Sequence, residues 1–233
     1  KNLNNRLKII KRSEINKNIA EAKALMAKLN FHLPQWVYWT PEDWKSKGKE
    51  CDEIRDCSLG WDLTDFGWGD FDNIGLTLIT IRNGKHGDGR YPKPYCEKIM
   101  VVKENQVTPE HFHWLKTEDI INRGGGTLCM KLWMADRETE QPTDKEIEVS
   151  IDGVKTRVAP GETIRIEPGH SITYVPYLYH KFWGEGGDCL VGEVSTTNDD
   201  AADNRFLVPK GRFPRIEEDE APEHLLCTEY PEA

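Results

Sequence analysis

The hydrophobic positions near the start of the chain follow the spacing of a helix. One apolar stripe recurs at steps of three and four residues and consists of Ile15, Ile19, Ala22, Met26 and Leu29. Such a stripe predicts an amphipathic helix laid on the outside of the main domain, with Ser13 as its N-cap. A second helix start is expected at Thr40 and Pro41, where a capping hydroxyl precedes a proline in the first turn.

Residues 58–73 (SLGWDLTDFGWGDFDN) have neither a helical nor a strand period. They are rich in glycine, aspartate and aromatic residues, and glycine is a strong breaker of regular structure. This composition predicts an ordered loop that serves as a lid or as an interface segment.

From residue 74 onward the pattern changes to the two-residue period of strands. Strands are expected at residues 74–82, 96–102, 107–114, 126–134, 146–151, 154–158, 163–167, 171–175, 180–183 and 189–195. Asp152 and Gly153, between two of these strands, form the dipeptide typical of a two-residue hairpin. Many short strands separated by turns predict an all-β fold with added helices, built as an antiparallel β-barrel or jelly roll.

The same pattern divides the chain into three parts of one domain. Residues 1–57 are expected to form a helical extension packed on the barrel, and residues 58–197 the barrel itself. Residues 198–233 are polar and contain four prolines, so a segment that wraps the surface is expected there. No internal repeat and no linker suggests a second domain.

Composition narrows the range of partners. The 233 residues carry a formal net charge of -9, which disfavours nucleic acid and anionic membranes because both require a positive face. No stretch approaches the roughly 18 apolar residues of a membrane span. Residues 1–11 lack the apolar segment of a secretory signal. A globular protein of the cytoplasm is therefore expected.

Six cysteines, with no C-x-x-C pair among them, support that location. They are Cys51, Cys57, Cys96, Cys129, Cys189 and Cys227. In a chain of this size such spacing indicates reduced thiols in a cytosolic protein, and it disfavours a structural zinc site.

The strongest chemical signal lies in residues 110–118 (EHFHWLKTE). On a strand, His111 and His113 point to the same face, because side chains alternate. Glu118 can reach the same pocket if the strand ends near Lys116. Two imidazoles and one carboxylate suit Mn(II), Fe(II), Co(II) or Ni(II). His180, at the head of a later strand, is the best fourth ligand.

The alternative is that the two histidines form an ordinary surface pair, since one H-x-H on a strand is common. Glu118 and the distant His180 favour a metal site over that reading, because four metal-ligating side chains from two separate stretches are harder to explain without an ion.

The spacing of these residues resembles the first motif of the cupins, G-x5-H-x-H-x3,4-E-x6-G. The matching positions are His111, His113, Glu118 and Gly125. Asn105 stands in place of the first glycine, and asparagine is the next-best residue for a left-handed turn. The resemblance implies a cupin-type β-barrel.

The second cupin motif, G-x5-P-x-G-x2-H-x3-N, is matched less fully. Gly169 and His180 have the right separation. Val175 and Tyr177 stand where the motif has proline and glycine, and Gly184 replaces the final asparagine. His180 therefore rests on its spacing from Gly169 and on its place at the head of a strand.

A more specific resemblance is to the D-lyxose isomerases, a cupin-type family of sugar isomerases. It is seen in residues 61–67 (WDLTDFG), 111–114 (HFHW), 118–126 (EDIINRGGG), 179–183 (YHKFW) and 192–200 (GEVSTTNDD). The resemblance implies an Mn(II)-dependent homodimer that interconverts D-lyxose and D-xylulose, and D-mannose and D-fructose. On the resemblance alone, Asp200 and Arg205 are expected to bind the sugar.

The isomerase chemistry needs a base beside the metal to move a proton between C2 and C1 through an enediol. Glu193 is expected in that role, because a carboxylate within an apolar strand requires a partner or a task. Pairing with a buried cation explains Glu193 equally well. Lys116 and Lys98 could stabilise the enediolate or bind sugar hydroxyls, although most lysines are solvated.

Two other functions fit a cupin metal site. One is an Fe(II)-dependent dioxygenase, which also needs open metal positions, and the other is a non-catalytic sugar-binding cupin. A phosphosugar isomerase is disfavoured, because no glycine-rich phosphate loop or arginine cluster lies in the barrel region.

Overall fold

The computed structural model of the chain describes residues 9–211 and 215–233. Residues 1–8, which belong to the predicted extension, lie outside that range. The helices are α1 (Arg12–Lys28), η1 (Gln35–Tyr38), α2 (Pro41–Trp44), η2 (Lys49–Cys51) and α3 (Asp52–Asp56). The strands are β1 (Ile9–Lys11), β2 (Gly60–Thr64), β3 (Leu76–Arg82), β4 (Tyr95–Val102), β5 (Thr108–Phe112), β6 (Glu118–Met134), β7 (Ile147–Ile151), β8 (Val154–Val158), β9 (Ile164–Ile166), β10 (Ser171–Tyr174), β11 (Leu178–Thr196), β12 (Arg205–Phe206) and β13 (Arg215–Glu217).

Helix α1 buries the predicted apolar stripe against the sheet. Its buried residues pack with Ile79 and Ile99 on the outer face of β3 and β4. The predicted N-cap is wrong, since Lys11 occupies that position and Ser13 lies inside the helix. The Ser13 hydroxyl instead donates to Asp219 of the C-terminal segment. The start of α2 is confirmed: Thr40 caps it in a capping box, with Pro41 in the first turn.

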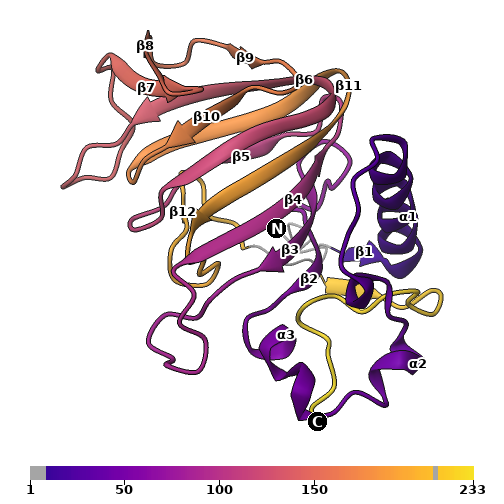
Figure 1. Cartoon of the computed structure of the whole chain (residues 1–233). Helices are drawn as coiled ribbons and strands as arrows, with labels where there is room; N and C mark the ends of the chain where they lie inside the picture. Colours follow the sequence, from indigo (N-terminus) through magenta and orange to yellow (C-terminus); the bar gives the residue numbers. More distant parts are fainter. Residues whose placement is uncertain (1–8, 212–214) are drawn as a thin grey trace, which may run out of the picture.

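An antiparallel sheet of eleven strands forms the body of the molecule (Figure 1). Its main hydrogen-bonded order is β2-β3-β4-β11-β6-β10-β7-β8, and β5, β9 and β12 join alongside. The strands of the described chain do not close into a ring, because β2 and β8 end this order. The predicted fold class, a cupin-type jelly roll with added helices, is confirmed with an open barrel.

Two long strands, β6 and β11, each pair with different neighbours along their length. The carboxyl half of β11 pairs with β4, and its amino half pairs with β5. Likewise β6 pairs with β10 near its start and with β9 further along. The strands bend where their register shifts at Gly125, whose φ is +92°. A side chain there would meet the carbonyl oxygen of Asp188 at 2.0 Å, so only glycine fits.

Several predicted turns are present. Asp152 and Gly153 both have positive φ and connect β7 to β8, as a type I′ hairpin requires. Asn105 has φ of +60°, which explains how it replaces the first motif's glycine. Tyr177 has φ of +65° at the glycine position of the second motif. Stacking of its ring on Phe112 at 5.0 Å favours this uncommon conformation.

The sequence predicted a loop over residues 58–73, and this prediction is only partly right. They contain β2, an edge strand of which all five residues are buried. Trp61 and Leu63 alternate with polar residues, but this short pattern lies among glycines and aspartates, which are typical of loops. Strand and loop together carry Phe66 into the main core.

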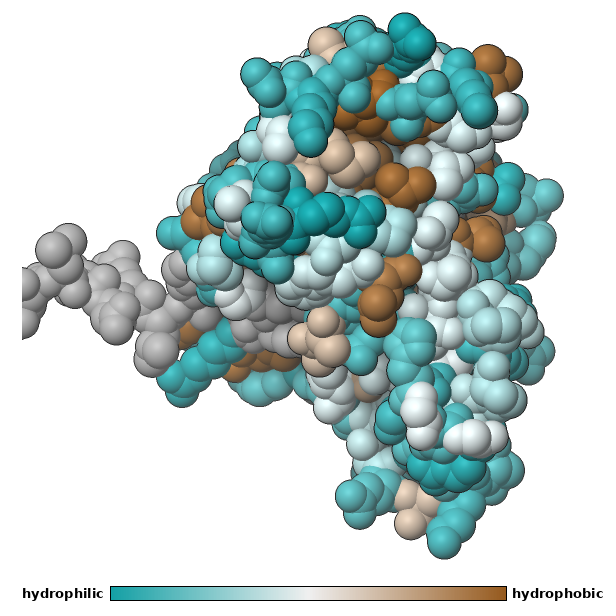
Figure 2. Space-filling model, turned by 90° about the vertical axis from the view of Figure 1, so that its left-hand side faces the viewer, coloured by the Kyte–Doolittle hydropathy of each residue, from teal (hydrophilic) through white to brown (hydrophobic). Residues whose placement is uncertain are grey.

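The C-terminal segment pairs with β1 near the N-terminus and with strands of the main sheet. β13 pairs with β1, and Leu226 bridges to Trp61 of β2. β12 joins the main sheet beside β5. Figure 2 shows a face on which hydrophobic side chains form separate patches among mostly hydrophilic ones. No helix in residues 9–211 or 215–233 combines the length and the apolar character needed to span a membrane.

Candidate metal centre

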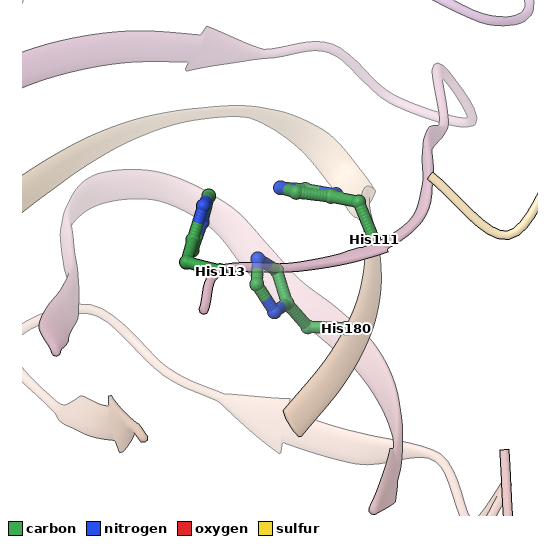
Figure 3. Close-up of side chains that lie close together, drawn as sticks. All are labelled: His111, His113 and His180. Carbon is green, nitrogen blue, oxygen red and sulfur yellow. The ribbon is translucent and has the colours of Figure 1, made fainter. Parts of the chain in front are cut away.

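Three buried histidines converge inside the barrel. His111 lies on β5, His113 follows that strand, and His180 lies on β11 directly opposite His111. One ring nitrogen from each lies within 4.8 Å of the other two. Figure 3 shows the three rings pointing toward one another. The predicted fourth member of the site, His180, is therefore brought together with the H-x-H pair.

Backbone carbonyls fix the tautomer of all three rings. Nδ1 of His111 lies 2.9 Å from the Pro109 oxygen, and Nδ1 of His180 lies 2.9 Å from the Leu178 oxygen. Nδ1 of His113 lies 2.7 Å from the oxygen of Asp203. A carbonyl oxygen only accepts, so each Nδ1 must donate. In the neutral ring Nε2 then keeps its lone pair for a metal.

Burial favours the neutral form of His111 and His180. It lowers the pKa of His111 well below its ordinary value, and the neighbouring His180 and His113 lower it further. Burial also lowers the pKa of His180 to about 4. Neutral imidazole is the form that binds metals, so His111 and His180 are in the ligating state at neutral pH.

Glu118, the first residue of β6, adds a carboxylate to the histidines. Its Oε1 lies 3.3 Å from Nε2 of both His113 and His180. Burial raises the pKa of Glu118, but the attraction of Lys116 opposes it, and the pKa is held well below its usual range. Three imidazoles with free Nε2 atoms and one ionised carboxylate fit a divalent ion.

A second carboxylate, that of Glu193, lies on the other side of Lys116 from Glu118. Lys116 Nζ is 3.1 Å from Glu118 Oε2 and 3.2 Å from Glu193 Oε2, and it donates to Asn198 Oδ1 at 2.8 Å. The pKa of Lys116 is raised, because the carboxylates outweigh the effect of burial. The pKa of Glu193 is raised by burial and by Glu118, against the opposing effect of Lys116 and Lys98. A carboxylate with a raised pKa beside a metal site suits proton transfer.

Lys98 and Asp200 lie on the same pocket. Lys98 of β4 is directly opposite Glu193 in the sheet, and its Nζ lies 3.4 Å from Asp200 Oδ1. Both residues line the cavity that contains the histidines. Lys98 and Lys116 are buried and paired with carboxylates, so neither is the solvated lysine of the alternative interpretation.

Arg205 does not join this group. It lies opposite Phe112 on β5, whereas its neighbour Phe206 lies opposite His111. Because side chains alternate along a strand, Arg205 faces away from the histidines. Its guanidinium pairs with Glu140 at 3.1 Å, and Arg205 is not among the residues that line the cavity.

Sequence reasoning missed several residues of the site. The cavity is also lined by Phe66, Leu76, Leu78, Met100, Thr108, Ile120, Phe182 and Asn204. Asp203 lies behind it and accepts hydrogen bonds from the backbone N–H groups of Leu115 and Lys116. The only available signal was the charged stretch after the last barrel strand, which does not indicate where its side chains point.

Comparisons with known proteins agree with this geometry. A family model described as D-lyxose isomerase matches residues 10–230. Two D-lyxose/D-mannose isomerases, from Serratia proteamaculans and from Escherichia coli O157:H7, are each 47% identical over 224 residues. Each alignment covers 95% of this chain and 98% of the relative.

Solved structures share the fold at much lower identity. The L-ribose isomerase of Acinetobacter sp. DL28 in complex with L-ribose gives a TM-score of 0.61 at 17% identity, over 91% of this chain and 99% of that one. The Cellulomonas parahominis enzyme with no ligand gives 0.58 at 16% identity, over 90% of this chain and 99% of that one. These two show the fold alone. The family match and the two relatives extend over almost the full length, and the chain therefore belongs to the D-lyxose isomerase family of sugar isomerases.

Proposed function

We propose that this chain is a metal-dependent aldose–ketose isomerase of unphosphorylated sugars. Its reactions are the interconversion of D-lyxose and D-xylulose and that of D-mannose and D-fructose, as the names of the relatives suggest. The observation that supports it best is the buried row Glu118, Lys116 and Glu193. This row sets a carboxylate of raised pKa next to a three-histidine centre.

His111, His113, His180 and Glu118 would hold the ion. A divalent ion bound there would act as a Lewis acid that polarises the sugar carbonyl and acidifies the adjacent C–H bond. Glu193 removes the proton from C2 of the aldose to give an enediol, a proton passes from O2 to O1, and Glu193 returns its proton to C1 to give the ketose.

The two lysines of the pocket have different proposed roles. Lys116 touches Glu193 and Asn198, so it orients the base and stabilises the negative charge that develops on the sugar. Lys98 and Asp200 form a charged pair at the pocket wall that can bind sugar hydroxyls. Arg205 was expected to bind the sugar as well, and the ion pair with Glu140 favours a structural role for it instead.

The pocket supports a neutral sugar over a phosphosugar. Among the described residues that line it, the cations are Lys98 and Lys116, and both already have carboxylate partners. A phosphate group would need further donors, of which arginine is the most suitable.

Three finer features are proposed with this function. Mn(II) is the proposed ion, although the same donor set accepts Fe(II), Co(II) and Ni(II). A homodimer is proposed from the family resemblance. A cytoplasmic location is proposed because all six cysteines are free thiols, as expected in a reducing compartment.

The decisive experiment measures ketose formation as metal is returned. Protein stripped with EDTA is incubated with D-lyxose or D-mannose without oxygen, and D-xylulose or D-fructose is followed as Mn(II) is added. Activity that returns with the ion supports the isomerase, and its oxygen independence excludes the dioxygenase alternative. If the metal-loaded protein forms no ketose from either sugar, the proposed function is wrong and the non-catalytic sugar-binding alternative is favoured.

A further inference from the structure

A β-bulge turns Thr108 toward the metal site. In the pairing of β5 with β11, His111 lies opposite His180 and Thr108 lies opposite Phe182. Three residues of β11 (180–182) are therefore matched by four of β5 (108–111), so β5 contains one extra residue. Pro109 lies within this bulge, where proline is tolerated because ladder hydrogen bonds are interrupted. Without the extra residue, Thr108 and His111 would point to opposite faces.

The bulge delivers a hydroxyl group to an apolar part of the pocket. Thr108 is 2% exposed and lines the cavity together with Leu76, Met100 and Phe182. Its Oγ1 is buried and has no hydrogen-bond partner in the part of the chain that the structure describes. A buried hydroxyl without a partner is costly, and most native structures avoid it.

We infer that Thr108 is a sugar-binding residue, whose hydroxyl hydrogen-bonds a hydroxyl of the sugar away from the carbonyl end. The inference rests on the proposed function, because it assigns a further contact to the same substrate. The carbonyl end is directed to the histidines and Glu193, and Thr108 lies one residue pair further along β5 and β11. A hydroxyl both donates and accepts, which suits a polyol.

The chain contains a matched control for this residue. Thr77 on β3 is also buried, and its Oγ1 also lacks a partner in the described chain. It faces the opposite side of the sheet, against Ala22 and Met26 of α1. Replacing either threonine by valine keeps the shape and removes only the hydroxyl, so both variants are expected to fold.

The experiment compares four metal-loaded proteins: wild type, Thr108→Val, Thr108→Ser and Thr77→Val. The first measurement is KM and kcat for D-lyxose. The second is calorimetric binding of D-arabinitol, the alcohol obtained by reducing D-lyxose, which cannot be isomerised. Metal content and melting temperature are measured in parallel.

Thr108→Val is expected to raise KM and the Kd for D-arabinitol about three- to tenfold, which is the range for one neutral hydrogen bond. Thr108→Ser is expected to recover most of that loss, and Thr77→Val to leave both constants unchanged. Equal constants for Thr108→Val and wild type would overturn the inference. So would wild-type protein that fails to bind D-arabinitol. Binding of D-arabinitol with the expected pattern, but no ketose from any sugar, would retain Thr108 as a binding residue and remove only the isomerase.

Discussion

Asp203 forms hydrogen bonds with the loop that connects two of the proposed metal ligands, His113 and Glu118. Its carboxylate accepts from the backbone N–H groups of Leu115 at 2.9 Å and Lys116 at 3.0 Å. Its own carbonyl oxygen accepts from His113 Nδ1 at 2.7 Å. Asp203 is 3% exposed, so water competes poorly for these partners. We predict that Asp203→Asn loosens the turn between His113 and Glu118 and weakens metal binding.

The magnitude follows from the hydrogen bonds that change. A hydrogen bond to a charged group contributes roughly 1.5–3 kcal/mol, so the two bonds to the carboxylate contribute about 3–6 kcal/mol together. Asparagine keeps one acceptor oxygen, and Asp203→Asn should therefore lower the free energy of unfolding by about 2–3 kcal/mol. Residues that orient metal ligands typically change metal affinity about 10–100-fold, and a loss in that range is expected.

Urea unfolding of the metal-free protein measures the stability, and competition with a chromophoric chelator measures metal affinity. Asp136→Asn is the matched control, because Oδ1 of Asp136 accepts from the backbone N–H groups of Glu138 and Thr139 in a loop that does not line the pocket. The control should lose stability without losing metal affinity. If Asp203→Asn binds the ion as tightly as wild type, Asp203 does not position His113 and Glu118, and the reasoning is refuted.

Two further predictions concern the base and the thiols. Glu193→Gln should retain full metal content but lower kcat by about 10²–10⁴-fold, which is the usual contribution of a general base. The control Glu185→Gln, on the same strand, should change neither metal content nor kcat. Full activity of Glu193→Gln would exclude Glu193 as the base. Burial raises the pKa of Cys96 and Cys189 to about 12 and that of Cys129 to about 11. These thiols stay protonated at a pH near 8, so Ellman's reagent should label them only after denaturation, and rapid labelling in the native state would contradict their burial.

The cluster of proposed metal ligands could be predicted because its signal is local and chemical. His111 and His113 share a strand face by alternation, and His180 was recognised by its distance from Gly169 in a motif. The barrel was predictable for a similar reason, because most of its strands alternate and are separated by glycine-rich turns. β2 was missed because its alternation of Trp61 and Leu63 with polar residues is short and lies in a stretch rich in glycine and aspartate.

The residues around the ligands could not be predicted in the same way. Alternation counted back from His111 places Thr108 on the opposite face, and only the extra residue in β5 corrects the count. A bulge leaves almost no trace in one sequence, apart from a proline within a strand. The same limit applies to Asp200 and Arg205, which the resemblance treated alike. One faces the pocket and the other pairs with Glu140.

The candidate metal centre depends on the C-terminal segment as well as on the barrel strands. Residues 198–233 were expected to wrap the surface, and within them Asn198, Asp200 and Asn204 contact the site or line its pocket. Asp203 holds the loop between His113 and Glu118 from behind, and Phe206 stacks on His111 at 5.0 Å. The barrel strands supply the proposed ligands, but this segment contacts His111 and His113 and holds the loop that leads to Glu118. A barrel truncated at residue 197 would therefore keep all four proposed ligands in sequence and lose the contacts that hold His111 and His113 in place.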